Sequence, residues 1–459
     1  MLMGCNDSSL DDKLTRIIKE QGLSGNPIRD VNQQVRTIDS LPARLGKLLF
    51  FSTQLSGQRD VACASCHHPL LGGDDDLSLS VGVNPVDIEV IGHHRRSKSA
   101  TILVPRNAPT TFNSSLWQRK LFHDGRIERL NEFSLLPPEI STPDEKFGDI
   151  DIGATSLVQA QAGFPVTSEH EMRAAYKDKS SNDSLRSALV DNLVKSVTKL
   201  SSDNVNSWQN LFLEVFPHSK NESLFELFNF QRIQFLIGEY EKSQVFIDTP
   251  WKAYVGGNKN ALTSDEKRGA ILFYTPVKNG GAGCVGCHSG DFFTDENFHV
   301  VAFPQIGEGV DIQGNDTGRY LRSGIPDDRY AFRTPSLINA TATAPYGHNG
   351  AFDDLKNAIQ YHLDPIKGSK KYDYSLKQLR QQGITNINAK KHTSSAVKQL
   401  IMLQRQQRSK LVVTTLSEKE IIELISFIGS LTDPCIKNAI CLSPWLPNAT
   451  EHPDNSILN

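Results

Sequence analysis

The chain has 459 residues, enough for two or three domains, and carries 49 basic against 52 acidic side chains. This near balance excludes the basic footprint of a nucleic-acid-binding protein, and a hydrophobic content of 38% is that of an ordinary globular protein. No apolar run approaches the roughly 20 residues of a membrane span.

The first 30 residues are polar, and we expect a flexible N-terminal tail there. Within it, Leu2, Gly4 and Cys5, followed by polar residues, resemble the processing site of a bacterial lipoprotein, although the apolar stretch that should precede such a site is absent. Either the sequence is read from a late start and Cys5 carries a lipid anchor, or Cys5 is incidental.

The pentapeptide Cys-x-x-Cys-His occurs twice, at residues 63–67 and 284–288. It is the attachment signature of c-type haem, in which two thiols bond the vinyl groups of one haem and the adjacent imidazole binds its iron. The sequence therefore predicts two covalently held haems. The residues concerned are Cys63, Cys66 and His67 in the first motif and Cys284, Cys287 and His288 in the second.

Two other uses of such cysteines are weaker. A structural zinc site could pool the two Cys pairs, but it would leave both following histidines unexplained. A redox dithiol needs one Cys-x-x-Cys in a βαβ context, not two copies each followed by histidine.

The two halves of the chain follow one plan. Segments with apolar residues at helical spacing, 45–50 and 268–273, precede the two motifs. After each motif comes an Arg-Pro-Asn loop, then a His-x-Gly turn at residues 123–125 or 348–350. We predict a mostly α fold of two cytochrome c-like haem domains related by internal duplication. Their expected ranges are 31–245 and 246–434.

Other segments suggest further elements. Helical patterning over 175–245 indicates helices that bridge the halves, and a lysine- and glutamine-rich stretch at 366–410 reads as an exposed insertion. Residues 263–266 and 417–420 are capping boxes that predict helix starts. In the C-terminal tail, 435–459, Cys435 and Cys441 are close enough for a small disulfide, which would fit an oxidising compartment; the alternative is two free thiols.

These motifs, in this order, resemble the bacterial di-haem cytochrome c peroxidase family, which also contains the MauG-type enzymes. The resemblance covers about residues 40–172 and 250–432. It is carried by the haem motifs and by these segments: 72–75 (Gly-Gly-Asp-Asp), 106–110 (Arg-Asn-Ala-Pro-Thr), 122–126 (Phe-His-Asp-Gly-Arg), 163–172, 333–337 and 344–350.

The resemblance implies a periplasmic enzyme that reduces hydrogen peroxide to water. Its N-terminal haem reacts with peroxide, and its C-terminal haem relays electrons from a small cytochrome c or cupredoxin. One alternative is a MauG-like enzyme that oxidatively modifies a partner protein. Another is a non-enzymatic two-haem electron carrier, and a homodimer is a state that the family allows.

The residue above the first haem departs from the family. Many members place a histidine there, within about ten residues of Gly-Gly-Asp-Asp, whereas this chain has Val83. Valine cannot ligate iron, so we expect an open first haem that needs no reductive activation. His93 and His94, just beyond, are the alternative ligands, although the neighbouring basic residues favour an exposed loop there.

Glu171 matches the family's distal glutamate. Cleavage of the O–O bond requires a proton to move from the inner to the outer peroxide oxygen, and a carboxylate above the haem can carry it. The competing interpretation is a solvated surface glutamate; the preceding residues 163–165 favour the catalytic one.

The second haem needs a sixth ligand, which the family supplies as Met or Tyr seven residues after a leucine. Counting from Leu355 reaches His362, and Tyr361 is the alternative ligand. The competing interpretation is that His362 lies on the helix surface and that another group binds the iron. A His/His pair would lower the reduction potential relative to His/Met.

Between the haems, the family's tryptophan is replaced by His123. Histidine is much harder to oxidise, which makes electron hopping through this catalytic candidate doubtful; direct tunnelling or Trp117 would then serve.

The family also binds one calcium ion between its domains. Its ligands match Asn107 through the side chain and Thr343 and Pro345 through their carbonyls, an all-oxygen set that suits Ca²⁺.

Overall fold

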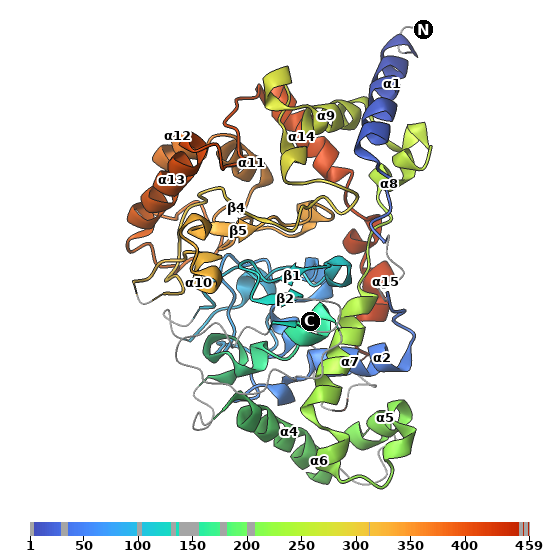
Figure 1. The fold of residues 1–459 in the computed structure, drawn as a ribbon. Coiled ribbons are helices and arrows are strands. Elements are labelled where there is room, and N and C mark those ends of the chain that lie inside the picture. Colours follow the sequence, from blue (N-terminus) through green and yellow to red (C-terminus); the bar gives the residue numbers. More distant parts are fainter. Residues whose placement is uncertain are drawn as a thin grey trace.

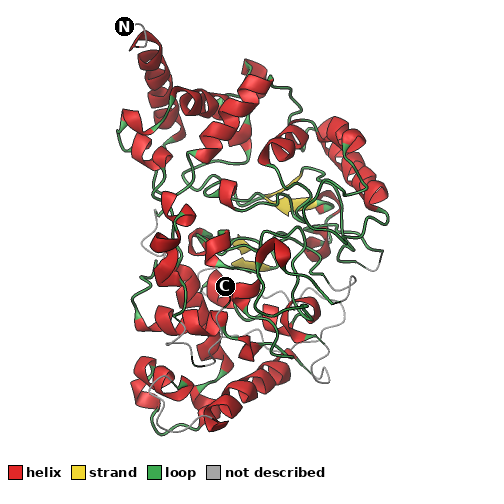
Figure 2. Ribbon diagram, turned by 180° about the vertical axis from the view of Figure 1, so that it is seen from behind, coloured by secondary structure: helices red, strands yellow, loops and turns green. Residues whose placement is uncertain are grey.

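The computed structural model describes residues 4–28, 35–98, 103–129, 135–136, 156–174, 181–199, 207–311, 313–448, 453 and 458. It is mostly helical, as predicted, and has two lobes stacked end to end (Figure 1). Seen from behind, the few short strands lie in the middle of the molecule, between the helices of the two lobes (Figure 2). Within the described ranges, no helix is both long and apolar enough to cross a membrane.

The N-terminal lobe is built around a core that includes Leu49, Phe50, Trp208, Phe212 and Tyr240. Helices within 175–245, which the sequence predicted to bridge the two halves, instead supply much of this core. Its helices are α2 (Leu41–Phe51), α3 (Leu157–Gln161), α4 (Asn182–Lys199), α5 (Trp208–Val215), α6 (Leu224–Leu227) and α7 (Phe230–Ser243). Strands β1 (Lys120–Leu121), β2 (Ile127–Arg129) and β3 (Leu135–Leu136) form an antiparallel sheet in the order β1-β2-β3.

The C-terminal lobe has its own core, with Trp251, Phe273, Phe293 and Phe427 at its centre. Its helices are α8 (Pro250–Val255), α9 (Ser264–Tyr274), α10 (Tyr320–Ser323), α11 (Leu355–Leu363), α12 (Pro365–Lys371), α13 (Ala389–Arg405) and α14 (Glu418–Gly429). Strands β4 (Phe298–Val300) and β5 (Ala331–Arg333) pair antiparallel. The predicted capping boxes are confirmed at the starts of α9 and α14.

Each lobe contains the same helix crossing. In α2, Gly46 lies against the backbone carbonyl of Leu236 in α7; in α9, Gly269 lies against the carbonyl of Glu423 in α14. A Cβ atom at either glycine would overlap that carbonyl oxygen, so only glycine allows the two backbones to approach this closely. The two glycines hold equivalent places, one residue after Leu45 and Arg268.

The N-terminal segment differs from the flexible tail that its polar composition predicts. Helix α1 (Gly4–Gln21) packs on the C-terminal lobe near α9, where Leu14 is fully buried. Asp11 accepts a hydrogen bond from the Tyr254 hydroxyl and pairs with Lys267 at 3.0 Å. The polar composition concealed an amphipathic helix whose apolar stripe is narrow.

The lysine- and glutamine-rich stretch is only partly an exposed insertion. Ala396, Leu400 and Leu403 of α13 are buried against β4 and β5, and Leu379 is buried in a separate cluster beside α11. Its charged side chains face outward, as the composition predicted.

The C-terminal segment folds back onto the N-terminal lobe. The predicted Cys435–Cys441 disulfide is confirmed. It joins Cys441, within the short helix α15 (Ala439–Leu442), to Cys435 before that helix. Beyond α15, the Trp445 indole donates a hydrogen bond to the Ser243 carbonyl at 3.2 Å. The Tyr240 hydroxyl in turn donates to the Trp445 carbonyl at 2.8 Å.

Candidate functional site

Both Cys-x-x-Cys-His motifs form short turns of 3-10 helix, at Cys63–Ser65 and Cys284–Gly286. In each turn the histidine amide donates to the carbonyl of the first cysteine, at 3.0 and 2.9 Å. None of the four motif cysteines forms a disulfide. The predicted arrangement, two thiols and one imidazole gathered on a single turn, is therefore formed twice.

The two motif histidines are held in the same orientation. His67 Nδ1 lies 3.3 Å from the Gly73 carbonyl, and His288 Nδ1 lies 3.2 Å from the Phe293 carbonyl and 3.1 Å from that of Pro335. A carbonyl partner fixes Nδ1 as the protonated nitrogen and leaves the Nε2 lone pair available to a metal. Burial also lowers the pKa of His67 to about 4, which keeps the ring neutral.

His362, at the end of α11, faces His288. Their ring centroids are 6.5 Å apart. An imidazole nitrogen binds a metal at about 2 Å, and its ring centroid lies about 1 Å farther, so two imidazoles on opposite sides of one iron have centroids roughly 6–6.5 Å apart. Burial and the neighbouring His288 lower the pKa of His362 to about 4, so its ring is neutral. The geometry fits one iron between them.

Tyr361, the alternative ligand, is engaged elsewhere. Its hydroxyl donates to the Ala302 carbonyl at 2.6 Å, and its ring stacks on Phe303. The phenol is buried, which raises its pKa and opposes the phenolate form that iron would require.

The surroundings of the first motif are different. The Val81 carbonyl lies 3.9 Å from Cys66 Sγ, and the next residues run beside Glu171: Gly82 packs on its backbone, and the Val83 amide donates to the His170 carbonyl at 3.3 Å. Val83 is itself buried. Among the described residues, no imidazole faces His67 as His362 faces His288.

His93 and His94 do not fill that place. Both are exposed, and His93 pairs with Asp76 at 3.3 Å. The loop that carries them is held by Arg95, which, contrary to the exposed basic loop predicted there, is 2% exposed. Its guanidinium donates to backbone carbonyls, including that of Val81 at 2.8 Å.

Glu171 lies in a single π-helical turn, Glu169–Arg173, and its side chain is half-buried. Burial raises the pKa of its carboxyl, and the positive charge of Arg126 opposes that rise. Arg126 lies 4.2 Å from the Phe122 ring centroid and 3.3 Å from Asp124. A carboxyl in these surroundings holds its proton to higher pH than a solvated glutamate does, as a proton shuttle requires.

His123 lies where the lobes meet. Its Nε2 is 3.0 Å from the Asn107 carbonyl, and its own carbonyl accepts from the Arg333 amide at 2.8 Å. Burial and Arg106 lower its pKa to about 4. The backbone amide of Asn107 donates to the carbonyl of His348, which is the histidine of the second His-x-Gly turn. Asn107 therefore connects the two equivalent turns.

A buried ion network, which sequence reasoning missed, joins the lobes. Arg106 contacts Asp316 through two hydrogen bonds, 2.7 and 2.9 Å, and Asp124 at 2.8 Å. Arg322 reaches Asp124 from the C-terminal lobe at 3.3 Å. Although burial opposes ionisation, these arginines hold the pKa of Asp124 well below its usual range. The pairs between the lobes could not be found from spacing, because Arg106 lies 210 residues from Asp316 and Arg322 lies 198 residues from Asp124.

Trp117 also crosses the lobe contact. The Arg333 guanidinium lies over its ring, 3.3 Å from the centroid, and the ring meets Phe292 edge-on at 5.1 Å. A stacked cation makes removal of an electron from the indole harder. This position brings Trp117 close to the second motif, but its cation disfavours an oxidised tryptophan.

The residues expected to hold calcium also lie at this contact. Asn107 is 7% exposed; its Nδ2 donates to the Leu77 carbonyl, and no donor within the described ranges reaches its Oδ1. Thr343 and Pro345 precede His348, whose carbonyl binds the Asn107 amide. An amide oxygen that accepts no hydrogen bond is a ligand of the kind that Ca²⁺ takes.

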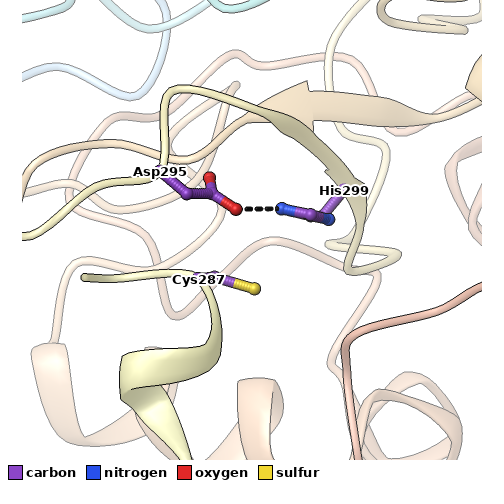
Figure 3. Close-up of side chains that lie close together, drawn as sticks. All are labelled: Cys287, Asp295 and His299. Carbon is purple, nitrogen blue, oxygen red and sulfur yellow. Dashed lines mark hydrogen bonds and ion pairs between the residues drawn. The ribbon is translucent and has the colours of Figure 1, made fainter.

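A third group of potential ligands adjoins the second motif. Cys287, Asp295 and His299 place their ligand atoms within 4.8 Å of one another, and the Asp295–His299 hydrogen bond is 2.8 Å (Figure 3). Cys287 belongs to the haem motif, however, and a thioether sulfur is a much poorer ligand than a thiolate. We therefore assign no metal to this group.

Known proteins resemble this chain in sequence and in fold. The family described as di-haem cytochrome c peroxidase matches residues 41–260. The methylamine utilization protein MauG of Methylorubrum extorquens is 27% identical over 329 residues, 71% of this chain and 69% of the relative. Cytochrome c551 peroxidase of Pseudomonas aeruginosa is 25% identical over 373 residues, 81% of each chain. The structure of the diheme peroxidase BthA from Burkholderia thailandensis has a TM-score of 0.57 at 19% identity, covering 89% of both chains, which shows a shared fold.

Proposed function

Because this chain belongs to the di-haem cytochrome c peroxidase family, which also contains the MauG enzymes, we propose that it is a peroxidase with two c-type haems. Cys63, Cys66 and His67 would hold the first haem. Cys284, Cys287 and His288 would hold the second, with His362 as its sixth ligand. The observation that carries the proposal is the difference between the two sites: an imidazole faces His288, whereas Val83 and Glu171 adjoin the first motif.

The chain's own residues would divide the work as follows. The first haem supplies the iron at which peroxide binds. Glu171 accepts the proton from the inner peroxide oxygen and delivers it to the outer one, which leaves as water. Val83 and Gly82, which lie beside Glu171, have no side-chain atom that could bind iron, so they would not compete with peroxide there. Two electrons and two protons complete the reduction of hydrogen peroxide to two molecules of water.

We infer from the paired helix crossings that the two lobes are haem domains related by duplication. The support is the equivalence of Gly46 and Gly269, each against a backbone carbonyl of the second helix, together with the equivalent carbonyl partners of His67 and His288. The N-terminal domain would be the peroxide-reacting one.

Calcium is part of the proposal. Asn107 through Oδ1, and Thr343 and Pro345 through their carbonyls, would hold the ion at the lobe contact, where it would fix the separation of the haems. Haem c attachment and the Cys435–Cys441 disulfide support a periplasmic location.

Electron paramagnetic resonance of the oxidised protein tests the proposal. We expect one high-spin signal from an open first haem and one low-spin signal from the bis-histidine haem. One equivalent of peroxide should remove the high-spin signal without prior reduction. Two low-spin signals that peroxide leaves unchanged would contradict the proposal and favour an electron carrier.

A MauG-like activity is the second candidate. Position 362 holds a histidine and not a methionine, and Val83 could not ligate the first iron; both features favour it. The discriminating measurement is turnover: a peroxidase consumes peroxide continuously with a reduced donor, whereas an enzyme acting on a partner protein oxidises that partner in proportion to the peroxide added.

A further inference from the structure

The charge of this chain is distributed very unevenly. Residues 365–417, here called the basic segment, contain eleven lysines and arginines and a single acidic residue, Asp373, which is a formal charge of +10. The whole chain carries −3, so all other residues together carry −13. Opposite charges that are separated in this way create a directional field, which an evenly mixed surface does not.

All eleven basic side chains of the segment are exposed. Three form ion pairs: Arg380 with Asp76, Arg408 with Asp327, and Lys410 with Asp295. The other eight have no ion-pair partner among the residues that the structure describes. They are Lys367, Lys370, Lys371, Lys377, Lys390, Lys391, Lys398 and Arg405.

The C-terminal end of this segment lies along the edge of the second haem motif. Lys410 Nζ donates to the carbonyl of Gly286, within that motif, at 3.1 Å. Four residues later the Thr414 amide donates to the carbonyl of Leu363, next to His362, at 3.0 Å. Residues 410–414 therefore run from the side of His288 to the side of His362.

Two exposed apolar side chains lie on this short stretch. Val412 is 57% exposed and Val413 is 37% exposed. An exposed apolar contact within a field of one sign is the composition of a transient docking surface, because charge steers the encounter and a small dry contact lets it dissociate. Exposure of Gly286 beside them leaves the motif itself open to a partner.

We propose that the basic segment, with Val412 and Val413 at its end, is the docking surface for a small electron-transfer protein with an acidic face. Such a partner would be steered by the charges of α12 and α13 and would settle with its redox centre next to the second haem. The inference rests on the proposed function for the direction of electron flow, but the contact itself does not require peroxide.

The test measures electron transfer without peroxide. Reduced flavodoxin, a small acidic flavoprotein, is mixed with the oxidised holoprotein, and reduction of the second haem is followed by stopped-flow absorbance. Reduced riboflavin, which carries the same kind of ring without the acidic surface, is the control reductant. We expect the flavodoxin rate constant to fall at least about tenfold as salt rises, and the riboflavin rate to change little.

A matched pair of variants locates the surface. Lys398→Glu with Arg405→Glu reverses two charges on α13, and Arg44→Glu with Lys220→Glu reverses two exposed charges on the far lobe, on α2 and between α5 and α6 (Figure 1). The first pair should slow flavodoxin about tenfold at low salt and leave riboflavin unchanged; the second pair should leave both unchanged.

Equal effects of the two pairs, or a flavodoxin rate that salt does not alter, would overturn the proposal. Binding to vesicles that contain phosphatidylglycerol is measured as well. If the vesicles bind the α13 surface and the α13 variant does not change the flavodoxin rate constant, the segment recognises an anionic membrane instead. Failure of the peroxidase proposal would appear separately, as absence of peroxide turnover with riboflavin as the reductant.

Discussion

Replacing Arg106 by methionine should destabilise the protein more than any surface charge change. Arg106 is 6% exposed, and its guanidinium pairs with Asp316. Removing one partner of a buried pair typically costs about 3–5 kcal/mol because the other charge is left without compensation. Asp124 keeps Arg126 and Arg322, so only Asp316 loses its cation. We therefore expect the lower end of that range, about 3 kcal/mol.

The loss should depend on pH. In the native protein Arg106, against the effect of burial, lowers the pKa of Asp316, so its stabilising contribution is present above the unfolded carboxyl pKa and is lost as pH falls through the folded value. Without Arg106, burial alone should raise that pKa. The variant is then penalised at pH 7, and protonation of Asp316 should partly relieve the penalty as the pH falls.

Denaturant unfolding of the holoprotein, followed by circular dichroism and haem absorbance, measures the effect. Adding Asp316→Asn to Arg106→Met should recover part of the loss, since no unpaired charge remains. Lys356→Met, which breaks the exposed pair with Glu418, is the control and should cost less than about 0.5 kcal/mol. A loss below about 1 kcal/mol for Arg106→Met, or one that is constant from pH 5 to 7, would refute the reasoning.

Four further outcomes follow from the site and its scaffold. Glu171→Gln should lower the rate of reaction with peroxide by about 10²–10⁴-fold while leaving haem spectra intact; an unchanged rate in stopped-flow would exclude the shuttle. In the native enzyme that rate should fall with acidification at a pH above the usual glutamate range, because only the ionised carboxyl accepts a proton and burial raises its pKa. His362→Ala should convert the second haem from low to high spin, and a persistent low-spin spectrum would point to another ligand. Gly269→Ala should cost at least about 2 kcal/mol in unfolding free energy, whereas Gly429→Ala, into open space on α14, should be neutral or stabilising; equal effects would contradict the helix crossing.

Much of the chemistry could be predicted from the sequence because its determinants are local. The Cys-x-x-Cys-His turns, the capping boxes of α9 and α14 and the Cys435–Cys441 disulfide each lie within a few residues. Short separations limit the conformations available, so spacing nearly fixes geometry.

Tertiary structure decided what depends on distant residues. Counting from Leu355 favoured His362 and left Tyr361 as the alternative. Only packing shows that the Tyr361 hydroxyl bonds to the Ala302 carbonyl, whereas the His362 ring faces His288. Likewise α1 looked like a flexible tail because a narrow apolar stripe is recognisable only when the surface that covers it is known. The Arg106 network and the run of residues 410–414 along the second motif join segments more than a hundred residues apart, where sequence spacing carries no geometric information.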